Sequence, residues 1–183
     1  VAIRHSMPYG NLKDETCQRF ASEKDFKRYK TTIEEEEEYQ PWINNGFVVY
    51  SGFDYKKIVQ AAEKEADVLI FDGGNNDLSM LKPDLLIVVV DPHRRGHELT
   101  YYPGFVNLLM ADVVIINKVD SAKKENIQIV EKNIQTYNPK AKIIHARSEL
   151  VVDHSEQIKN KKCAVIGDGP TLSHGGMSFG AGT

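Results

Sequence analysis

The sequence contains no apolar run that approaches the ~20 residues needed by a membrane-spanning helix, and no signal peptide is visible. It has only two cysteines, Cys17 and Cys163, and neither has the spacing of a metal site. We therefore expect reduced thiols and a cytoplasmic protein. The formal net charge is −3, so no excess of basic residues favours nucleic acid or an anionic membrane as a partner.

The phosphate-binding pattern G-x-x-x-x-G-K-[ST] is also missing. Without it, neither a backbone cradle nor a lysine for the β- and γ-phosphates of a nucleotide is evident. What is present is ordinary for a globular protein: of 183 residues, 41% are hydrophobic and 27% are charged. This length suffices for one domain with a substantial core, and we find no internal repeat and no internal linker.

Short apolar runs alternate along the chain with segments of helical pattern. The runs lack a two-residue period, which indicates strands that are covered on both faces. We therefore predict an α/β fold with a three-layer, mainly parallel, doubly wound sheet. The expected strands cover 1–5, 47–51, 67–71, 85–90, 112–116, 142–146 and 163–166, and the expected helices cover 23–29, 33–44, 54–66, 105–110, 122–137 and 153–160.

Two of these helices have clear start signals. Ser22 is a plausible cap for the helix at 23–29, and Thr32 followed by Glu35 forms a capping box for the next helix. The acidic run 34–38 fits the positive end of that helix dipole. It is either a solvated first turn or a site for a metal or a partner.

The segment Asn117-Lys118-Val119-Asp120 follows an apolar run and precedes a helical pattern. A carboxylate such as Asp120 can accept two hydrogen bonds from the N1–H and the exocyclic amine of guanine, while the Asn117 amide contacts its N7/O6 edge. The aliphatic stem of Lys118 can lie along a ring face. At the carboxyl end of a strand, this pattern predicts a corner that binds a nucleotide base.

In a doubly wound sheet, ligands bind beyond the carboxyl ends of the strands, so the residues that follow each strand are candidates for a binding site. Asp72 follows an apolar run and precedes two glycines. A carboxylate in that place can hold Mg²⁺, usually through water, and the glycines let phosphates approach the backbone. The alternative is a loop aspartate that caps the next turn.

A loop that contains Pro92 and Gly96 carries a basic cluster. Arginine side chains suit phosphates, carboxylates or the charge of a phosphoryl-transfer transition state. The alternative is a solvated loop whose charges pair with nearby acids. A transition-metal site is not favoured, because the histidines lie on separate loops without ligand spacing. The cluster consists of His93, Arg94, Arg95 and His97.

Hydroxyl, acidic, histidine and glycine residues also gather within 168–177. Such a loop could cradle an anionic substrate through Asp168, Thr171 and His174. The alternative is a connector between domains.

Five segments together resemble the cyclic 2,3-diphosphoglycerate synthetase family, whose relatives are often described as predicted GTPases. They are Val-Ala-Ile-Arg-His-Ser-Met-Pro-Tyr-Gly (1–10), Asp-Gly-Gly-Asn-Asn (72–76), Val-Asp-Pro-His-Arg (90–94), Ala-Asp-Val-Val-Ile-Ile-Asn-Lys-Val-Asp (111–120) and Asp-Gly-Pro-Thr-Leu-Ser-His-Gly-Gly-Met (168–177). The resemblance covers nearly the whole chain in order. It implies a P-loop NTPase-like domain, and an activity in which ATP drives closure of an intramolecular phosphoanhydride in 2,3-bisphosphoglycerate.

In that family the phosphate-binding loop precedes the segment similar to 1–5. The chain opens with a strand-like run at Val1 and ends in a glycine-rich segment. We therefore expect residues 1–183 to be an N-terminally truncated domain that lacks the first strand and the phosphate-binding loop, with about 168–183 as a connector. We expect it to bind triphosphate poorly by itself.

The resulting hypothesis is a purine nucleotide-dependent phosphotransferase or synthetase that uses Mg²⁺ and either ATP or GTP. Its partners would be the nucleotide and an anionic small molecule, and a homo-oligomer is left open. The alternatives are a GTP-hydrolysing regulatory switch of the same fold and a noncatalytic binding module. We assign catalysis to Arg94, Arg95 and His97, nucleotide binding to Asn117, Lys118 and Asp120, metal binding to Asp72, and substrate binding to Arg4, His5, Asp168, Thr171 and His174.

Overall fold

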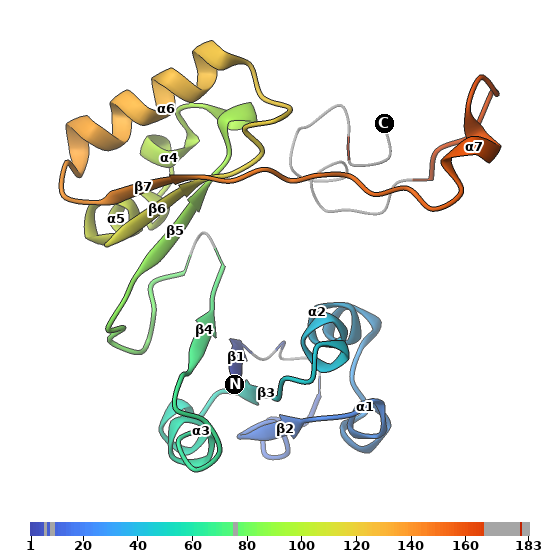
Figure 1. Cartoon of the computed structure of the whole chain (residues 1–183). Coiled ribbons are helices and arrows are strands. Elements are labelled where there is room, and N and C mark those ends of the chain that lie inside the picture. Colours follow the sequence, from blue (N-terminus) through green and yellow to red (C-terminus); the bar gives the residue numbers. More distant parts are fainter. Residues whose placement is uncertain (6, 8–9, 75–76, 167–179, 181–183) are drawn as a thin grey trace.

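The computed structural model describes residues 1–5, 7, 10–74, 77–166 and 180. In this part of the chain the strands form two sheets (Figure 1). One has the order β2-β3-β1-β4 and the other has the order β5-β6-β7. The strands are β1 (Ala2–His5), β2 (Gln18–Phe20), β3 (Val49–Gly52), β4 (Ile70–Asp72), β5 (Ile87–Val90), β6 (Val113–Ile116) and β7 (Lys142–His145).

Each sheet has its own helices (Figure 1). The first sheet has α1 (Glu23–Tyr29), α2 (Ile33–Asn44) and α3 (Tyr55–Ala62). The second has the 3₁₀ helix η1 (Pro92–Arg94), α4 (His97–Thr100), α5 (Gly104–Met110) and α6 (Lys124–Tyr137). The short helix α7 (Ser155–Ile158) follows β7.

Most strand pairs are parallel. β1 pairs in parallel with β3 and with β4, and β6 pairs in parallel with β5 and β7. The exception is β2, which pairs with β3 in the antiparallel direction. The α/β class with mainly parallel strands is therefore confirmed, and the described strands form two sheets.

Helices cover both faces of the first sheet. Neighbouring residues of a strand point to opposite faces, so each strand contributes to both contacts. On one face, Ala2 and Val49 are buried with Phe20, Phe26 and Tyr39 of β2, α1 and α2. On the other face, Ile3 and Tyr50 are buried with Ile58 and Ala62 of α3. This sheet has the three-layer arrangement that was predicted.

The second sheet is packed against helices on one face. Val90, Val114 and Ile116 are buried there with Leu108 of α5 and with Val130 and Ile134 of α6. The other face retains exposed apolar side chains, with Ile87, Val89 and Ile144 at 49%, 55% and 40% exposure.

The strands β4 and β5, which follow one another along the chain, are not paired with each other. Within the described residues, β4 pairs only with β1, and β5 pairs only with β6. The exposed Ile70, Ile87 and Val89 lie on these two strands. Each sheet therefore ends on an apolar strand with one unpaired edge.

The structure differs from the sequence expectations in three segments. Residues 163–166 are described but form no strand, and Ile166 is 95% exposed. The expected helix at 153–160 is the single turn of α7. β2 lies where no strand was expected, because its hydrogen bonds come from β3 rather than from any local pattern.

Candidate functional site

Three loops meet at the carboxyl ends of β5, β6 and β7. They follow Val90, Ile116 and His145, which end these strands. Backbone hydrogen bonds connect the loops: Asn117 N donates to Val90 O over 3.0 Å, and Val119 N donates to Ala146 O over 3.1 Å. The predicted base-binding segment is thereby fixed between its two neighbouring strands.

Lys118 is held in a defined position. Its backbone is left-handed, with φ 57°. Its Nζ lies 2.8 Å from Oδ2 of Asp91, the residue that follows β5. Asp91 also accepts a hydrogen bond from His93 N at 2.9 Å and so caps η1. One carboxylate therefore orients both the predicted base-binding lysine and the start of the basic loop.

Asp120 lies at the same edge. Its Oδ1 accepts a hydrogen bond of 3.1 Å from Ser148 N, in the loop after β7. This contact orients the carboxylate without neutralising its charge, as a base-reading carboxylate requires. Asn117 and Asp120 thus flank a lysine whose side chain reaches back toward η1.

The basic loop lies against the start of α6. His93 Nε2 is 3.0 Å from Ser121 Oγ, and Arg95 Nη1 donates to Asn126 Oδ1 over 2.6 Å. Arg94 ends η1 and is half-buried. His97 begins α4 and its ring packs edge-on against Tyr101, with 5.0 Å between centroids. The loop is thus anchored beside the base-binding segment rather than freely extended.

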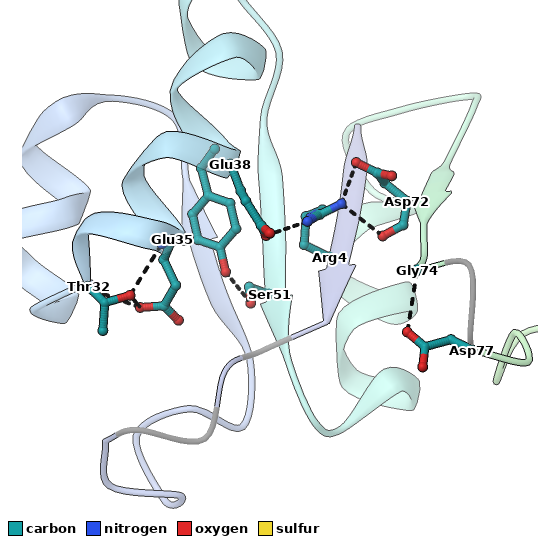
Figure 2. A network of polar contacts seen from close by, with 9 residues as sticks. Arg4, Thr32, Glu35, Glu38, Ser51, Asp72, Gly74 and Asp77 are labelled. Atoms are coloured by element: carbon teal, nitrogen blue, oxygen red, sulfur yellow. Dashed lines mark hydrogen bonds and ion pairs between the residues drawn. The ribbon is translucent and has the colours of Figure 1, made fainter. Parts of the chain in front are cut away.

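The remaining predicted residues of the described chain lie at the first sheet (Figure 2). Arg4 of β1 donates from Nη2 to Glu38 of α2, and its Nη1 lies 2.6 Å from Oδ2 of Asp72, which ends β4. Nη1 also donates to Asp72 O over 3.3 Å. His5 Nδ1 is 2.7 Å from Tyr55 Oη. Arg4, His5 and Asp72 therefore form a second group of predicted residues.

Electrostatics at this second group keep Arg4 charged. Burial by itself lowers the pKa of Arg4, but the hydrogen bonds and charges of Glu38 and Asp72 outweigh burial and raise that pKa above its ordinary value. Nearby, burial raises the pKa of Tyr39 to about 12, and its hydroxyl donates to Ser51 Oγ over 2.9 Å. The tyrosine is therefore a neutral hydrogen-bond donor at physiological pH.

Asp72 could take part in holding a metal. Its side chain is 38% exposed at the end of a strand. The described residues contain no group of three or more His, Cys, Asp and Glu side chains that could hold a metal ion. Mg²⁺ usually keeps several waters and needs only one or two carboxylates with substrate phosphates. A single carboxylate is thus compatible with Mg²⁺ but not with a metal enclosed by protein ligands.

A cavity of about 240 Å³ lies at the first sheet, next to the start of α2. None of the predicted site residues lines it. The predicted residues Asp168, Thr171 and His174 lie outside the described part of the chain.

Three residues that contact predicted site residues were not predicted from the sequence. They are Glu38 as the partner of Arg4, Asp91 as the partner of Lys118, and Ser148 as the donor to Asp120. Glu38 was included only in the acidic run, yet it faces β1 rather than solvent alone. Asp91 carried a usable signal, since it follows a strand at the same edge as Lys118. Ser148 carried none, because its backbone N–H makes the contact.

A parallel α/β fold with polar loops gathered at its strand ends defines the class, an α/β domain of the kind whose ligand site lies at the carboxyl ends of the strands. A sequence model of the family described as "Cyclic 2,3-diphosphoglycerate synthetase, P-loop domain" matches residues 45–147. The chain belongs to this family. Among the described residues, no helix is long and apolar enough to cross a membrane.

Two curated relatives are similar to the chain. One, named arginine synthetase ArcE, from Thermococcus kodakarensis, is 56% identical over 182 residues, which is 100% of this chain and 41% of the relative. The other, named cyclic 2,3-diphosphoglycerate synthetase, from Thermococcus sibiricus, is 33% identical over 127 residues, which is 68% of this chain and 29% of the relative. The chain thus spans well under half the length of both relatives.

Proposed function

We propose that the whole protein is a purine nucleotide-dependent synthetase, and that residues 1–183 supply the base-binding edge of its nucleotide site. The observation that carries the proposal is the arrangement after β5, β6 and β7. There Asn117 and Asp120 flank a lysine fixed by Asp91. Synthetases couple nucleotide cleavage to bond formation, so both relatives' names are consistent with such a site.

The contacts at this edge favour guanine over adenine. A carboxylate at Asp120 accepts hydrogen bonds, and guanine offers N1–H and an exocyclic amine as donors, whereas adenine presents an unprotonated N1. The ATP use that the family resemblance implies opposes this preference. We propose guanine as the preferred base, with Mg²⁺ bound through Asp72, water and the nucleotide phosphates.

The triphosphate requires a cradle that the 183 residues do not contain as a G-x-x-x-x-G-K-[ST] pattern. Such a loop connects a strand to a helix. The edges of β4 and β5 that are unpaired among the described residues support a place for one further parallel strand. We propose that this strand completes a single sheet and brings the phosphate-binding loop between Asp72 and the basic loop.

In this arrangement Arg94 and Arg95 would neutralise charge on the phosphates, and His97 would contact the reacting group or the acidic substrate. Arg4 and His5 would face the substrate from the first sheet. The same role falls to Asp168, Thr171 and His174. Arginine forks suit phosphate and carboxylate oxygens, which supports the assignment.

The higher identity to the arginine synthetase makes arginine formation the first reaction to test, and closure of 2,3-bisphosphoglycerate the second. A synthetase runs backward when its products are supplied. The whole protein is incubated with arginine, phosphate and either GDP or ADP, and formation of GTP or ATP is measured. In parallel, release of phosphate from each triphosphate is measured with and without 2,3-bisphosphoglycerate. If neither nucleotide is formed or consumed in a metabolite-dependent way, the proposal is wrong.

A GTP-hydrolysing switch is the second candidate, and the Asn-Lys-x-Asp segment specifically favours it. The two functions differ in their product. A switch releases phosphate from GTP without any small-molecule acceptor and faster with a protein partner, whereas a synthetase leaves a new bond in a metabolite.

A further inference from the structure

Arg4 is bound by two carboxylates that approach it from opposite sides (Figure 2). Glu38 comes from α2 and Asp72 from the end of β4. The Asp72 side chain is 38% exposed, Glu38 is 35% exposed, and Arg4 between them is 18% exposed. The remaining guanidinium nitrogen, Nε, is buried and has no hydrogen-bond partner among the described residues.

The backbone of Arg4 is fixed. β1 is hydrogen-bonded on both sides, and Arg4 is in register with Ser51 of β3 and with Asp72 of β4. Only the side chain can respond to a change at Asp72. Because Nη1 contacts Asp72 and Nη2 contacts Glu38, the guanidinium can release Asp72 and still keep a carboxylate partner.

A divalent cation at Asp72 would lie within a few ångströms of the Arg4 guanidinium, whose Nη1 is 2.6 Å from Asp72 Oδ2, so the repulsion between the two positive charges sets the two contacts in competition. We propose that Arg4 competes with the divalent cation for Asp72, and that Glu38 holds Arg4 when the cation displaces it. The inference rests on the proposed metal role of Asp72, which belongs to the proposed function.

The charges in the cluster support this exchange. One guanidinium and two carboxylates leave a net charge of −1. Cation binding at Asp72 frees Nη1, which then becomes available to an oxygen of an anionic substrate. The cation and the anion therefore favour each other's binding, and the coupling is reciprocal.

The test measures Mn²⁺ binding to the whole protein with and without a nonhydrolysable GTP analogue, with free Mn²⁺ quantified by electron paramagnetic resonance. Arg4→Gln removes the competitor and is expected to tighten binding about tenfold. Glu38→Gln removes the alternative partner, leaves Arg4 on Asp72, and is expected to weaken binding several-fold. Asp72→Asn is expected to abolish the site.

Matched controls come from a second arginine–glutamate pair. Arg19 contacts Glu65 through its Nε and Nη2, at 2.8 to 3.3 Å, and connects β2 to the segment after α3. Arg19→Gln and Glu65→Gln make the same changes in charge away from Asp72, so both are expected to leave Mn²⁺ affinity unchanged. This comparison separates competition from a general effect of net charge.

Opposite shifts in Arg4→Gln and Glu38→Gln support the proposal when Glu38→Gln has no further effect in the Arg4→Gln background, because a direct charge effect of Glu38 on the cation would persist there. A folded Arg4→Gln protein that binds Mn²⁺ no tighter than wild type overturns it. If Arg4→Gln does not fold, Glu38→Gln decides, and unchanged or tighter binding overturns the proposal. Wild-type affinity in Asp72→Asn also overturns it, while base preference at Asp120 would still test the nucleotide site separately.

Discussion

At the scale of single residues, the geometry of the site depends on carboxylates that orient basic side chains. Lys118 has a left-handed backbone and its amine contacts Asp91, which also caps η1. An exposed or half-exposed ion pair of this kind contributes about 0.5–1 kcal/mol. The main effect of the Lys118–Asp91 pair is to orient the lysine, because in the proposed site the lysine stem lies along the nucleotide base.

Asp91→Asn removes the charge that holds Lys118 but keeps an oxygen that can cap η1. We expect nucleotide affinity to fall by about two- to fivefold, in line with the small energy of such a pair. The measurement is calorimetric titration of the whole protein with GTP. Asp84→Asn, at an exposed position, serves as the control and should have no effect. Equal affinity in Asp91→Asn and wild type would remove this role.

A second prediction concerns Glu65 and acid stability. Hydrogen bonds from Arg19, then from Tyr50, lower the pKa of Glu65 from 4.5 to about 2. Because the folded-state pKa is depressed, the contribution to stability is complete above pH 4.5 and is lost as pH falls toward 2. We expect the difference in unfolding free energy between wild type and Glu65→Gln to shrink from about pH 7 to about pH 3, as measured with urea. A difference independent of pH would contradict it.

At the scale of elements, local sequence signals predicted the starts of helices, but they did not predict strands that depend on pairing with distant residues. The first residues of α1 and α2 followed from Ser22 and Thr32, whose capping boxes are present. The strand at 163–166 was wrong, because an apolar run becomes a strand only where a neighbour offers hydrogen bonds. β2 was missed for the converse reason: three residues in a polar segment are a strand only through pairing with β3.

Gly52, at the end of β3, fixes how the segment before β2 meets the sheet. Its φ is +151°, and a Cβ there would lie 2.5 Å from Thr16 O and 2.7 Å from Glu15 O. Gly52→Ala should therefore destabilise the fold by about 2 kcal/mol or more, through both strain and backbone clash. Gly46 also has a positive φ, but a Cβ added there would have no atom within 4 Å. Gly46→Ala should therefore reduce the free energy of unfolding by only about 1 kcal/mol. The stabilities of the two variants can be compared by thermal unfolding. Equal losses of stability would contradict a backbone clash at Gly52.

At the scale of the whole molecule, the sequence predicted the α/β class and the family, and it placed the polar loops at strand ends. It could not predict the break between β4 and β5, because nothing local distinguishes a strand with two neighbours from a strand with one. Nor could it predict that Glu38 lies beside Arg4, since 34 residues separate them in sequence.

The open edges lead to a prediction for the whole protein. If a further strand lies between β4 and β5, their backbone amides should be as strongly protected from hydrogen exchange as those of β1 and β6. Exchange of β4 and β5 can be followed by mass spectrometry of peptic fragments. Fast exchange at both strands, with slow exchange at β1 and β6, would show that the edges stay open.

The assignment of the base-binding edge has one direct test. In Asp120→Asn the side chain keeps an oxygen for Ser148 N but loses the second acceptor that guanine needs. Asp112→Asn, whose carboxylate accepts from Leu86 N at the opposite end of β6, is the isosteric control. We predict that competition titrations of the whole protein will show a preference for GTP in wild type and in the control, and a shift toward XTP in Asp120→Asn. An unchanged ratio of XTP to GTP affinity would contradict base recognition by this edge.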